Sequence, residues 1–363
     1  NKMAIYLDYN ATTPIRDKVK QSMLEVMGPP LNSSSVHSYG RKAKSYLQNA
    51  RNSVANLINA NNDQIVFTSG GTEANCMIMQ SSKRPLISSV EHDAVMASSS
   101  NPEFIEVNSD GVVNLDKLEE KINSTNPDMI SVMWANNETG VIQPINEIVE
   151  ISKKFKIHVH CDAVQAVGKI KIDFKSSGLN SMAISSHKIG GPVGVGALVV
   201  SDPFNINPII FGGGQEMGHR SGTENLIGIV GFGSASDLVS KDSELISKIR
   251  IKQKQFEVVL KDNLSGIKIF GENVERLPNT TCIYMPHLEA DAQVIALDLE
   301  GYAVSAGSAC SSGKVKSSHV LKAMNAEWAS NKSIRISSGW QNNQNDLEKL
   351  AHAYIELYKR SNE

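Results

Sequence analysis

Several features that mark specialised proteins are missing from this sequence. Its 363 residues include 36 basic and 38 acidic side chains, for a net charge of −2, and no basic run stands out. Proteins that bind nucleic acid usually show a basic patch, so this balance gives no reason to expect that partner. No apolar stretch approaches the roughly 18 residues that a membrane span requires. We therefore expect neither nucleic acid nor a membrane as a partner.

Cysteine is scarce as well. The chain has four cysteines, at 76, 161, 282 and 310, and none of them forms a Cys-x-x-Cys pair. A chain of this length does not need disulfides to fold, and the N-terminal residues show no secretory leader. We therefore expect a reducing, cytoplasmic location. Cys161 and Cys282 lie in strand-like runs and are expected to be buried, Cys76 is expected on a helix, and only Cys310 lies in an open sequence context.

Strand and helix patterns alternate through the first two thirds of the chain. Helical patterns such as 115–122 and 145–155 separate short apolar runs that are typical of buried strands. These runs occupy residues 65–68, 86–88, 129–133, 159–161, 182–185 and 197–200. The alternation predicts an α/β fold with a mostly parallel sheet covered by helices.

A second set of elements follows near residue 250. The patterns predict helices at 243–264, 290–299 and 346–358, and strands at 267–270, 282–285 and 333–337. A chain of this length can bury one large core and a smaller second one. We therefore expect a large domain over residues 16–250 and a smaller α+β domain formed by 1–15 and 251–363.

Lys188 closes the apolar run 182–185, and Asp162 and Gln165 follow an earlier run. A lysine amine can bond covalently to the aldehyde of pyridoxal phosphate. An aspartate can pair with the cofactor's ring nitrogen and keep it protonated, so that the ring accepts electrons. Taken alone, a lysine after a strand is as easily an ordinary solvated residue. With a phosphate-binding turn upstream, these residues supply the attachments that this cofactor needs.

Such a turn follows the strand at 65–68. Gly71 and Thr72 open a helix, where backbone amides bind phosphate and a threonine hydroxyl adds a donor. Two further polar positions follow strands: His92 can stack on a flat ring or handle protons, and Asn137 can donate to a ring hydroxyl or a carboxylate. The alternatives are an ordinary turn at 71–72, a helix-capping or surface histidine, and a turn asparagine.

Three later features also suit a ligand site. The glycine-rich segment 212–225, which includes Thr223, indicates close approach to a ligand or partner, or else a flexible surface loop. Cys310 stands among small residues between Gly307 and Gly313, a loop that can bring a thiolate into a site and out again; otherwise it is an unreactive cysteine in a turn. Arg335, within a predicted strand, suits the bidentate capture of a carboxylate, or else a surface ion pair.

Together these residues resemble the cysteine desulfurase family of pyridoxal phosphate enzymes. That family is class-V aminotransferase-like with fold type I, and the similarity is to the branch with a long mobile cysteine loop. It begins at residues 6–14 (YLDYNATTP), includes 35–37 (SVH) and 67–73 (FTSGGTE), and reaches 333–337 (SIRIS). The resemblance implies a homodimer that converts L-cysteine to alanine and passes the sulfur to an acceptor protein, such as an iron–sulfur scaffold.

The resemblance also implies roles for individual residues. Lys188 would hold the cofactor, His92 would stack on its ring, and Cys310 would receive the sulfur as a persulfide. Asn137 and Arg335 would bind the substrate carboxylate. No resident metal is expected, although Cys310 could ligate an iron–sulfur cluster during transfer. The cofactor-binding residues implied are Gly71, Thr72, Asp162, Gln165, Ser185, His187, Lys188 and, from the other subunit, Thr223.

Two alternatives remain open at this point. The chain could be another pyridoxal phosphate enzyme of this fold, such as a selenocysteine lyase or an aminotransferase, but aminotransferase chemistry would not need the thiol of Cys310. It could also be a degenerate paralogue that acts as a binding partner without catalysis. The retention of Lys188, His92, Asp162, Gln165 and Cys310 argues against that second alternative.

Overall fold

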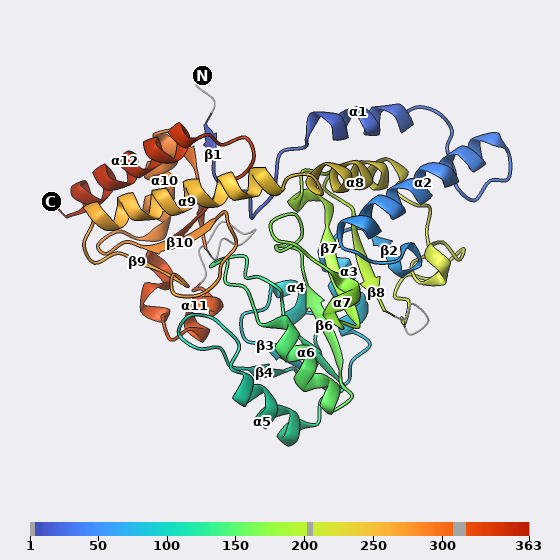
Figure 1. Ribbon diagram of the computed structural model, residues 1–363, viewed down its shortest axis with the longest axis horizontal. Helices are drawn as coiled ribbons and strands as arrows, with labels where there is room; N and C mark the ends of the chain where they lie inside the picture. Colours follow the sequence, from blue (N-terminus) through green and yellow to red (C-terminus); the bar gives the residue numbers. More distant parts are fainter. Residues whose placement is uncertain (1–3, 202–205, 308–316, 363) are drawn as a thin grey trace.

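A seven-stranded sheet lies at the centre of the larger of two lobes, and most of its strands are the apolar runs described above (Figure 1). The structure, a computed structural model, describes residues 4–201, 206–307 and 317–362. In the sheet the strand order is β2-β8-β7-β6-β5-β3-β4, and β8 alone runs antiparallel to its neighbours. The strands are β2 Ile65–Thr68, β3 Pro85–Ser88, β4 Glu103–Ile105, β5 Met129–Ser131, β6 His158–Asp162, β7 Ser181–Ser185 and β8 Gly196–Val200.

Both faces of this sheet are buried, because alternate residues of each strand enter different cores. In β7, Met182 and Ile184 belong to one hydrophobic cluster, while Ala183 belongs to another. The first cluster contains residues of α2, α5, α6 and α8, and the second contains residues of α3. The helices of this lobe are α1 Asp17–Val26, α2 Ser38–Leu57, α3 Gly71–Met79, α4 Asp93–Met96, α5 Leu115–Thr125, α6 Ile145–Lys154, α7 Phe174–Ser177 and α8 Leu226–Val239.

Helix α8 was not expected from the sequence, since its residues are apolar on all sides and include several glycines. The glycines allow close helix packing: a Cβ at Gly233 would lie 2.6 Å from the Cα atom of Ala50 in α2. A Cβ at Gly231 would lie 2.9 Å from the sulfur of Met23 in α1. The short edge strand β4 was also not expected, because two of its three residues are exposed.

The smaller lobe has a four-stranded antiparallel sheet in the order β12-β13-β10-β9. Its hydrophobic core combines Leu7, from the start of the chain, with residues of α9, α10 and α12. Residue 250, where we expect the domain boundary, lies within α9, and the domain limits stay a prediction. The elements are β1 Ile5–Tyr6, α9 Ser243–Asn263, β9 Lys268–Ile269, β10 Thr280–Tyr284, α10 Ala290–Leu299, β11 Tyr302–Ala303, β12 Ser305–Ala306, α11 His319–Ala323, β13 Ser333–Ser337 and α12 Gln344–Ser361.

The predicted fold class is therefore confirmed, with a mostly parallel sheet covered by helices and a smaller α+β lobe. The first strand, β1, pairs in parallel with β11, so the N-terminal segment belongs to the smaller lobe before the chain enters the larger one. None of the helices in the described ranges is long and apolar enough to cross a membrane.

A buried ion pair joins α2 to the turn before α8. Arg51 donates to both carboxylate oxygens of Glu216, at 2.8 and 2.6 Å, and to the carbonyl of Ile65 in β2 at 2.6 Å. Glu216 also accepts the backbone N–H of Phe67 at 2.8 Å. Because the two side chains are only 10% and 2% exposed, loss of one partner would leave an uncompensated charge inside the protein.

We predict that Arg51→Ala lowers the free energy of unfolding by about 3–5 kcal/mol, the usual effect of breaking a buried pair. The control is Lys121→Ala, which removes the exposed 3.0 Å pair with Glu103 and should cost less than about 1 kcal/mol. Urea titrations followed by circular dichroism measure both values. Equal losses in the two variants would contradict the assignment.

Candidate active site

One cavity of about 410 Å³ brings together all of the predicted site residues except Thr223 and Cys310. It lies where β6 and β7 end and α3 begins, and the strand β13 of the smaller lobe contributes to its wall. The carboxyl ends of parallel strands are where such folds gather ligands. The predicted residues that line the cavity are Gly71, Thr72, His92, Asn137, Asp162, Gln165, Ser185, His187, Lys188 and Arg335.

Lys188 follows β7 directly and is held by the N-terminal segment. Its Nζ donates to the carbonyl oxygens of Asn10 at 2.5 Å and Ala11 at 2.7 Å. Burial, followed by the nearby positive charge of Arg335, lowers the pKa of Lys188 to about 8. A larger share of the amine is therefore unprotonated near neutral pH than for an ordinary lysine, as a nucleophilic amine requires.

Asp162 ends β6 on another wall of the cavity. One carboxylate oxygen accepts the N–H of Val164 at 2.9 Å, and the other accepts the side-chain amide of Asn75 at 2.8 Å. In the described parts of the chain no lysine or arginine forms an ion pair with this carboxylate. A buried anion held by neutral donors is suited to a cationic group that enters the cavity.

The start of α3 supplies a place for an anion. The N–H groups of a first helical turn have no partner within the helix, and a glycine lets a ligand come close. Gly71 is also required by packing, because a Cβ there would lie 2.7 Å from Val164. Ser185 and His187 line the same cavity. Burial and the charge of Lys188 lower the pKa of His187 to about 4, so His187 is a neutral hydrogen-bonding group.

His92 lines the cavity and also caps a helix. Its Nδ1 accepts the N–H of Ala94 at 3.0 Å, which makes it the N-cap of α4. The sequence-based alternative that His92 caps a helix is therefore correct. His92 caps α4 and lines the cavity at the same time. Because Nδ1 is the acceptor, Nε2 has the proton in the neutral ring.

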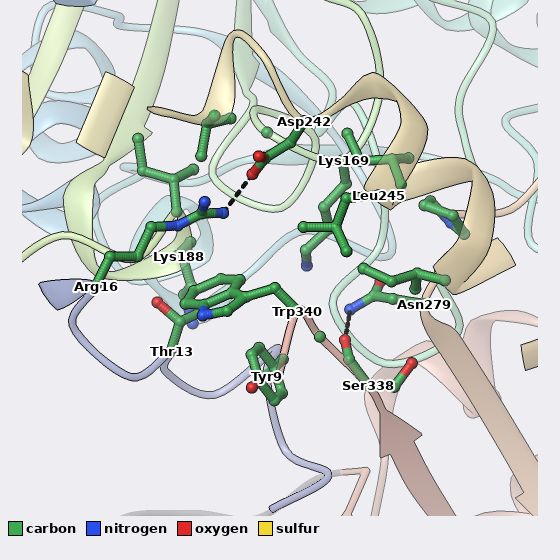
Figure 2. A pocket seen from close by; sticks show the side chains of 17 residues that line it. Tyr9, Thr13, Arg16, Lys169, Lys188, Asp242, Leu245, Asn279, Ser338 and Trp340 are labelled. Atoms are coloured by element: carbon green, nitrogen blue, oxygen red, sulfur yellow. Dashed lines mark hydrogen bonds and ion pairs between the residues drawn. The ribbon is translucent and has the colours of Figure 1, made fainter. Parts of the chain in front are cut away.

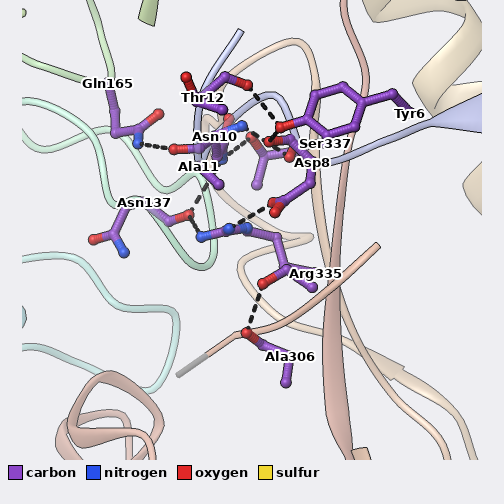
Figure 3. A network of polar contacts seen from close by, with 12 residues as sticks. Tyr6, Asp8, Asn10, Ala11, Thr12, Asn137, Gln165, Ala306, Arg335 and Ser337 are labelled. Carbon is purple, nitrogen blue, oxygen red and sulfur yellow. Dashed lines mark hydrogen bonds and ion pairs between the residues drawn. The ribbon is translucent and has the colours of Figure 1, made fainter. Parts of the chain in front are cut away.

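Arg335 reaches the cavity from β13 (Figure 3). It donates to Asp8 at 2.8 Å and to the carbonyl of Asn137 at 2.9 Å. Its Nε is buried and has no hydrogen-bond partner within residues 4–201, 206–307 and 317–362. Part of the guanidinium is therefore held in place by the protein, and Asn137 lines the cavity next to it.

Reasoning from the sequence missed Asn10, which joins most of these groups (Figure 3). Its carbonyl accepts from Lys188 and from Gln165 Nε2, its N–H donates to Ser337, and its side chain donates to Thr280. A single asparagine between a strand and a turn belongs to no periodic pattern, so periodicity cannot indicate this role. Only its position inside the motif at 6–14 marked Asn10 as a candidate site residue.

Lys169 is a second buried amine that the sequence did not reveal. Its Nζ donates to Asn10 Oδ1 and to Gln165 Oε1, both at 2.7 Å. Burial, with smaller contributions from Lys188 and Arg335, lowers the pKa of Lys169 well below its usual value. Figure 2 shows Lys169 and Lys188 beside a smaller cavity of about 40 Å³, which Arg16 and Trp340 also line. Lys188 therefore lies between two cavities.

Two predicted residues stay outside this arrangement. Thr223 is exposed and does not line the cavity of its own chain. Cys310 lies outside the described residues. Among the residues that the structure does describe, no group of three or more histidine, cysteine or acidic side chains could hold a metal ion.

The residues around the cavity fit pyridoxal phosphate. Asp162 supplies a buried carboxylate without a cationic partner among the described side chains, Lys188 supplies an amine with a lowered pKa, and Gly71 begins a helix whose N-cap, Gly70, makes no side-chain capping hydrogen bond. These suit a ring nitrogen, an aldehyde and a phosphate respectively.

Comparison with known proteins identifies the family. A family model described as aminotransferase class-V matches residues 5–350. The cysteine desulfurase IscS of Dictyoglomus turgidum is 37% identical over 95% of this chain and 92% of its own length. A NifS-like protein from Rickettsia africae is 40% identical with a TM-score of 0.91, covering 98% of this chain and 99% of that one. A structure described as SspA in complex with cysteine is 29% identical with a TM-score of 0.80, covering 92% and 98%.

The chain therefore belongs to the class-V aminotransferase family and, within it, to the cysteine desulfurases. The family resemblance drawn from the sequence motifs is confirmed, and so is the expectation of fold type I. The roles of the individual site residues stay predictions.

We predict that Arg335→Gln raises the pKa of Lys188, because a neighbouring positive charge disfavours the protonated amine. The measurement is the pH dependence of trinitrobenzenesulfonate modification in cofactor-free protein, with Lys188 located by peptide mass mapping. The modification midpoint should lie near pH 8 in the unaltered chain and at higher pH in the variant. Arg220→Gln, which alters an arginine paired with Glu73, is the control and should leave the midpoint unchanged. A midpoint that falls in Arg335→Gln would contradict this electrostatic account.

Proposed function

We propose that this protein is a pyridoxal-phosphate-dependent L-cysteine desulfurase that forms alanine and a persulfide on Cys310. One observation supports this most directly: Lys188, Asp162 and the first turn of α3 face the same cavity as Arg335. The first three suit the cofactor, and Arg335 suits the carboxylate of an amino acid. Cysteine as the substrate follows from the cysteine desulfurases among the relatives and from the relative described as a complex with cysteine.

In this proposal bound pyridoxal phosphate would supply an electron-accepting ring, and the chain's residues would hold cofactor and amino acid in place. Lys188 holds the aldehyde carbon, Asp162 keeps a proton on the ring nitrogen, and Gln165 contacts the ring hydroxyl. Gly71, Thr72, Ser185 and His187 bind the phosphate. His92 lies against the ring, and its Nε2 is free to exchange protons because Nδ1 caps α4.

Substrate binding in this proposal depends on the guanidinium of Arg335. Asp8 and the Asn137 carbonyl fix the orientation of the guanidinium, and its buried Nε has no partner among the described residues. An amino-acid carboxylate at this position would satisfy the remaining donors, and the Asn137 side chain lines the same cavity. The charge of Arg335 also helps to keep the Lys188 amine unprotonated, so that Lys188 can take and return protons at the substrate.

The sulfur step needs a second nucleophile, which we assign to Cys310. Its thiolate forms a bond with the substrate sulfur while the carbon–sulfur bond breaks. The electron pair of the broken bond stays with the substrate carbon, which then takes a proton and becomes the methyl group of alanine. Cys161 and Cys282 cannot do this, since burial raises the pKa of each thiol and β-strands hold both in place.

The alternatives receive less support. A non-catalytic paralogue would have no need for a buried carboxylate, an amine with a lowered pKa and an arginine around one cavity. A selenocysteine lyase would share this site, and nothing in the described residues favours it over a cysteine desulfurase.

We predict that Cys310→Ser retains the visible absorbance of bound pyridoxal phosphate but forms almost no alanine from cysteine. Mass spectrometry of the unaltered protein after cysteine treatment should find one added sulfur on the peptide that contains Cys310. Cys76→Ser is the matched control, because Cys76 is a free, half-buried thiol on α3, and its alanine production should be unchanged. Full activity in Cys310→Ser, or the added sulfur on another cysteine, would overturn the assignment.

The proposal includes a homodimer, in which Thr223 completes the phosphate site of the partner. Thr223 is exposed in its own chain, and two exposed apolar side chains belong to segments that bond to its loop. The N–H of Ser221 donates to the carbonyl of Ile210, and the side chain of Asn225 donates to the carbonyl of Gly194. Phe211 follows Ile210 and Val193 precedes Gly194, so both lie near this loop. These two are 81% and 69% exposed. An apolar patch of this kind supports an interface here.

We predict that Phe211→Asp converts a dimer into monomers and weakens pyridoxal phosphate binding about tenfold or more, the usual effect of losing a hydrogen bond to a charged group. Val258→Asp, at a 55% exposed position on α9, is the control and should remain dimeric. Sedimentation velocity and cofactor titration measure both effects. A fully active monomer would rule out the role of Thr223.

The sulfur acceptor in this proposal is another protein, such as an iron–sulfur scaffold. A reducing, cytoplasmic location suits a persulfide donor, and the described cysteines Cys76, Cys161 and Cys282 are free thiols.

A further inference from the structure

From Asp162 a chain of buried polar side chains leads away from the cavity along β6, and only its first member, Asn75, also lines the cavity. Asp162 accepts from Asn75 Nδ2 at 2.8 Å, and Asn75 Oδ1 lies 2.8 Å from His160 Nε2. His160 Nδ1 lies 2.9 Å from Ser181 Oγ, which is 3.2 Å from His158 Nε2. Asn75, His160 and Ser181 are at most 1% exposed. No local sequence pattern predicts this chain, because its members come from α3, β6 and β7.

The amide of Asn75 can take only one orientation beside an ionised Asp162. Its NH₂ group must face the carboxylate, because an amide oxygen in that place would repel the negative charge. The amide oxygen then faces His160 Nε2, which must have the proton and donate it. A neutral histidine protonated at Nε2 has an acceptor at Nδ1, so the Ser181 hydroxyl donates to Nδ1. The same hydroxyl oxygen remains free to accept from His158 Nε2.

Every hydrogen bond in the chain therefore points toward Asp162. The reversed direction would bring the Asn75 oxygen against Asp162, which is tolerable only when the carboxylate is protonated. The chain thus has two self-consistent arrangements, and the orientation of Asn75 is coupled to the ionisation of Asp162.

Burial keeps the surrounding groups uncharged. It lowers the pKa of His160 to about 3 and that of His158 to about 4, so both rings are neutral at physiological pH. It raises the pKa of Glu91, another acid close to Asp162, to about 8, so Glu91 is mostly protonated. Lys188 is the nearby cation on the cavity side. His158, His160 and Glu91 therefore add little charge of their own beside Asp162.

We propose that Asn75 and His160 are positioning residues that hold Asp162 ionised and oriented toward the cavity through this directed hydrogen-bond chain. Ser181 sets the tautomer of His160. The inference rests on the proposed function, in which Asp162 faces the ring nitrogen of pyridoxal phosphate. It adds that the basicity of the ring nitrogen is set through Asn75, at the cavity wall, by His160 and Ser181, which do not line the cavity.

The test compares His160→Leu with His160→Gln in the cofactor-loaded protein. Leucine removes the donor to Asn75, whereas the glutamine amide can replace Nε2–H. The direct measurement is the ¹⁵N chemical shift of pyridoxal phosphate labelled at its ring nitrogen. We expect the shift of a protonated ring in the unaltered chain and in His160→Gln. In His160→Leu we expect a shift toward the unprotonated ring, as in Asp162→Asn.

Kinetics provide the second readout. In His160→Leu, kcat should fall about 10- to 100-fold, the usual range for losing support to a charged group. The KM for cysteine should change little, because Arg335 and Asn137 are untouched. His160→Gln should retain most of kcat. A general packing defect would instead impair both His160 variants and lower their melting temperatures together.

Ser181→Ala is the second variant and removes a single oxygen atom, so it keeps the test decisive if His160→Leu does not fold. It should move the ring-nitrogen shift in the same direction by a smaller amount. An unchanged ¹⁵N shift in His160→Leu or, failing that variant, in Ser181→Ala would overturn the inference, and so would equal impairment of His160→Gln and His160→Leu. If the unaltered chain bound no pyridoxal phosphate, the proposed function would fail, and this inference with it.

Discussion

The site depends on the N-terminal segment passing between the two lobes, and Asn10 is the residue that fixes it there. Asn10 bonds to Lys188, Gln165 and Lys169 in the larger lobe, and to Thr280 and Ser337 in the smaller one. Without Asn10 each of the two buried amines would lose one of its two acceptors, which is costly in a protein interior. The position of Lys188 and the relative position of the two lobes are thus set by the same hydrogen bonds.

The electrostatics of the cavity follow from that arrangement. Lys188, Lys169 and Arg335 lie near one another, and the pKa values of both lysines are lowered. Asp8 compensates Arg335 directly, whereas Asp162 has no cationic partner among the described side chains. The site therefore has two amines with lowered pKa values on one side and, on another, a carboxylate without a cationic partner among the described side chains. That separation suits a ligand with an electrophilic carbon and a basic ring nitrogen.

Much of the fold could be predicted because strands of a buried parallel sheet are short apolar runs, and β2, β3, β5, β6, β7 and β8 all follow that rule. Helix α8 could not be predicted from the sequence. Its close packing against Ala50 and Met23 requires glycines, so the helix lacks an amphipathic pattern. The cavity residues that follow strands could also be predicted, because each comes directly after an apolar run. Asn10, Lys169 and His160 could not, because their partners are far away in sequence and no local pattern records such contacts.

The smaller lobe is built from both ends of the chain. Leu7 lies in the same core as Ile336, Leu350 and Tyr354, and the N–H of Asn10 bonds to the Ser337 hydroxyl. On the ribosome the first of these residues emerges long before the last, while long-range contacts of this kind form late. The sheet of the larger lobe can assemble earlier, but the wall formed by Arg335 is added only after β13 has been synthesised. The complete cavity is thus a late product of folding rather than a property of the larger lobe alone.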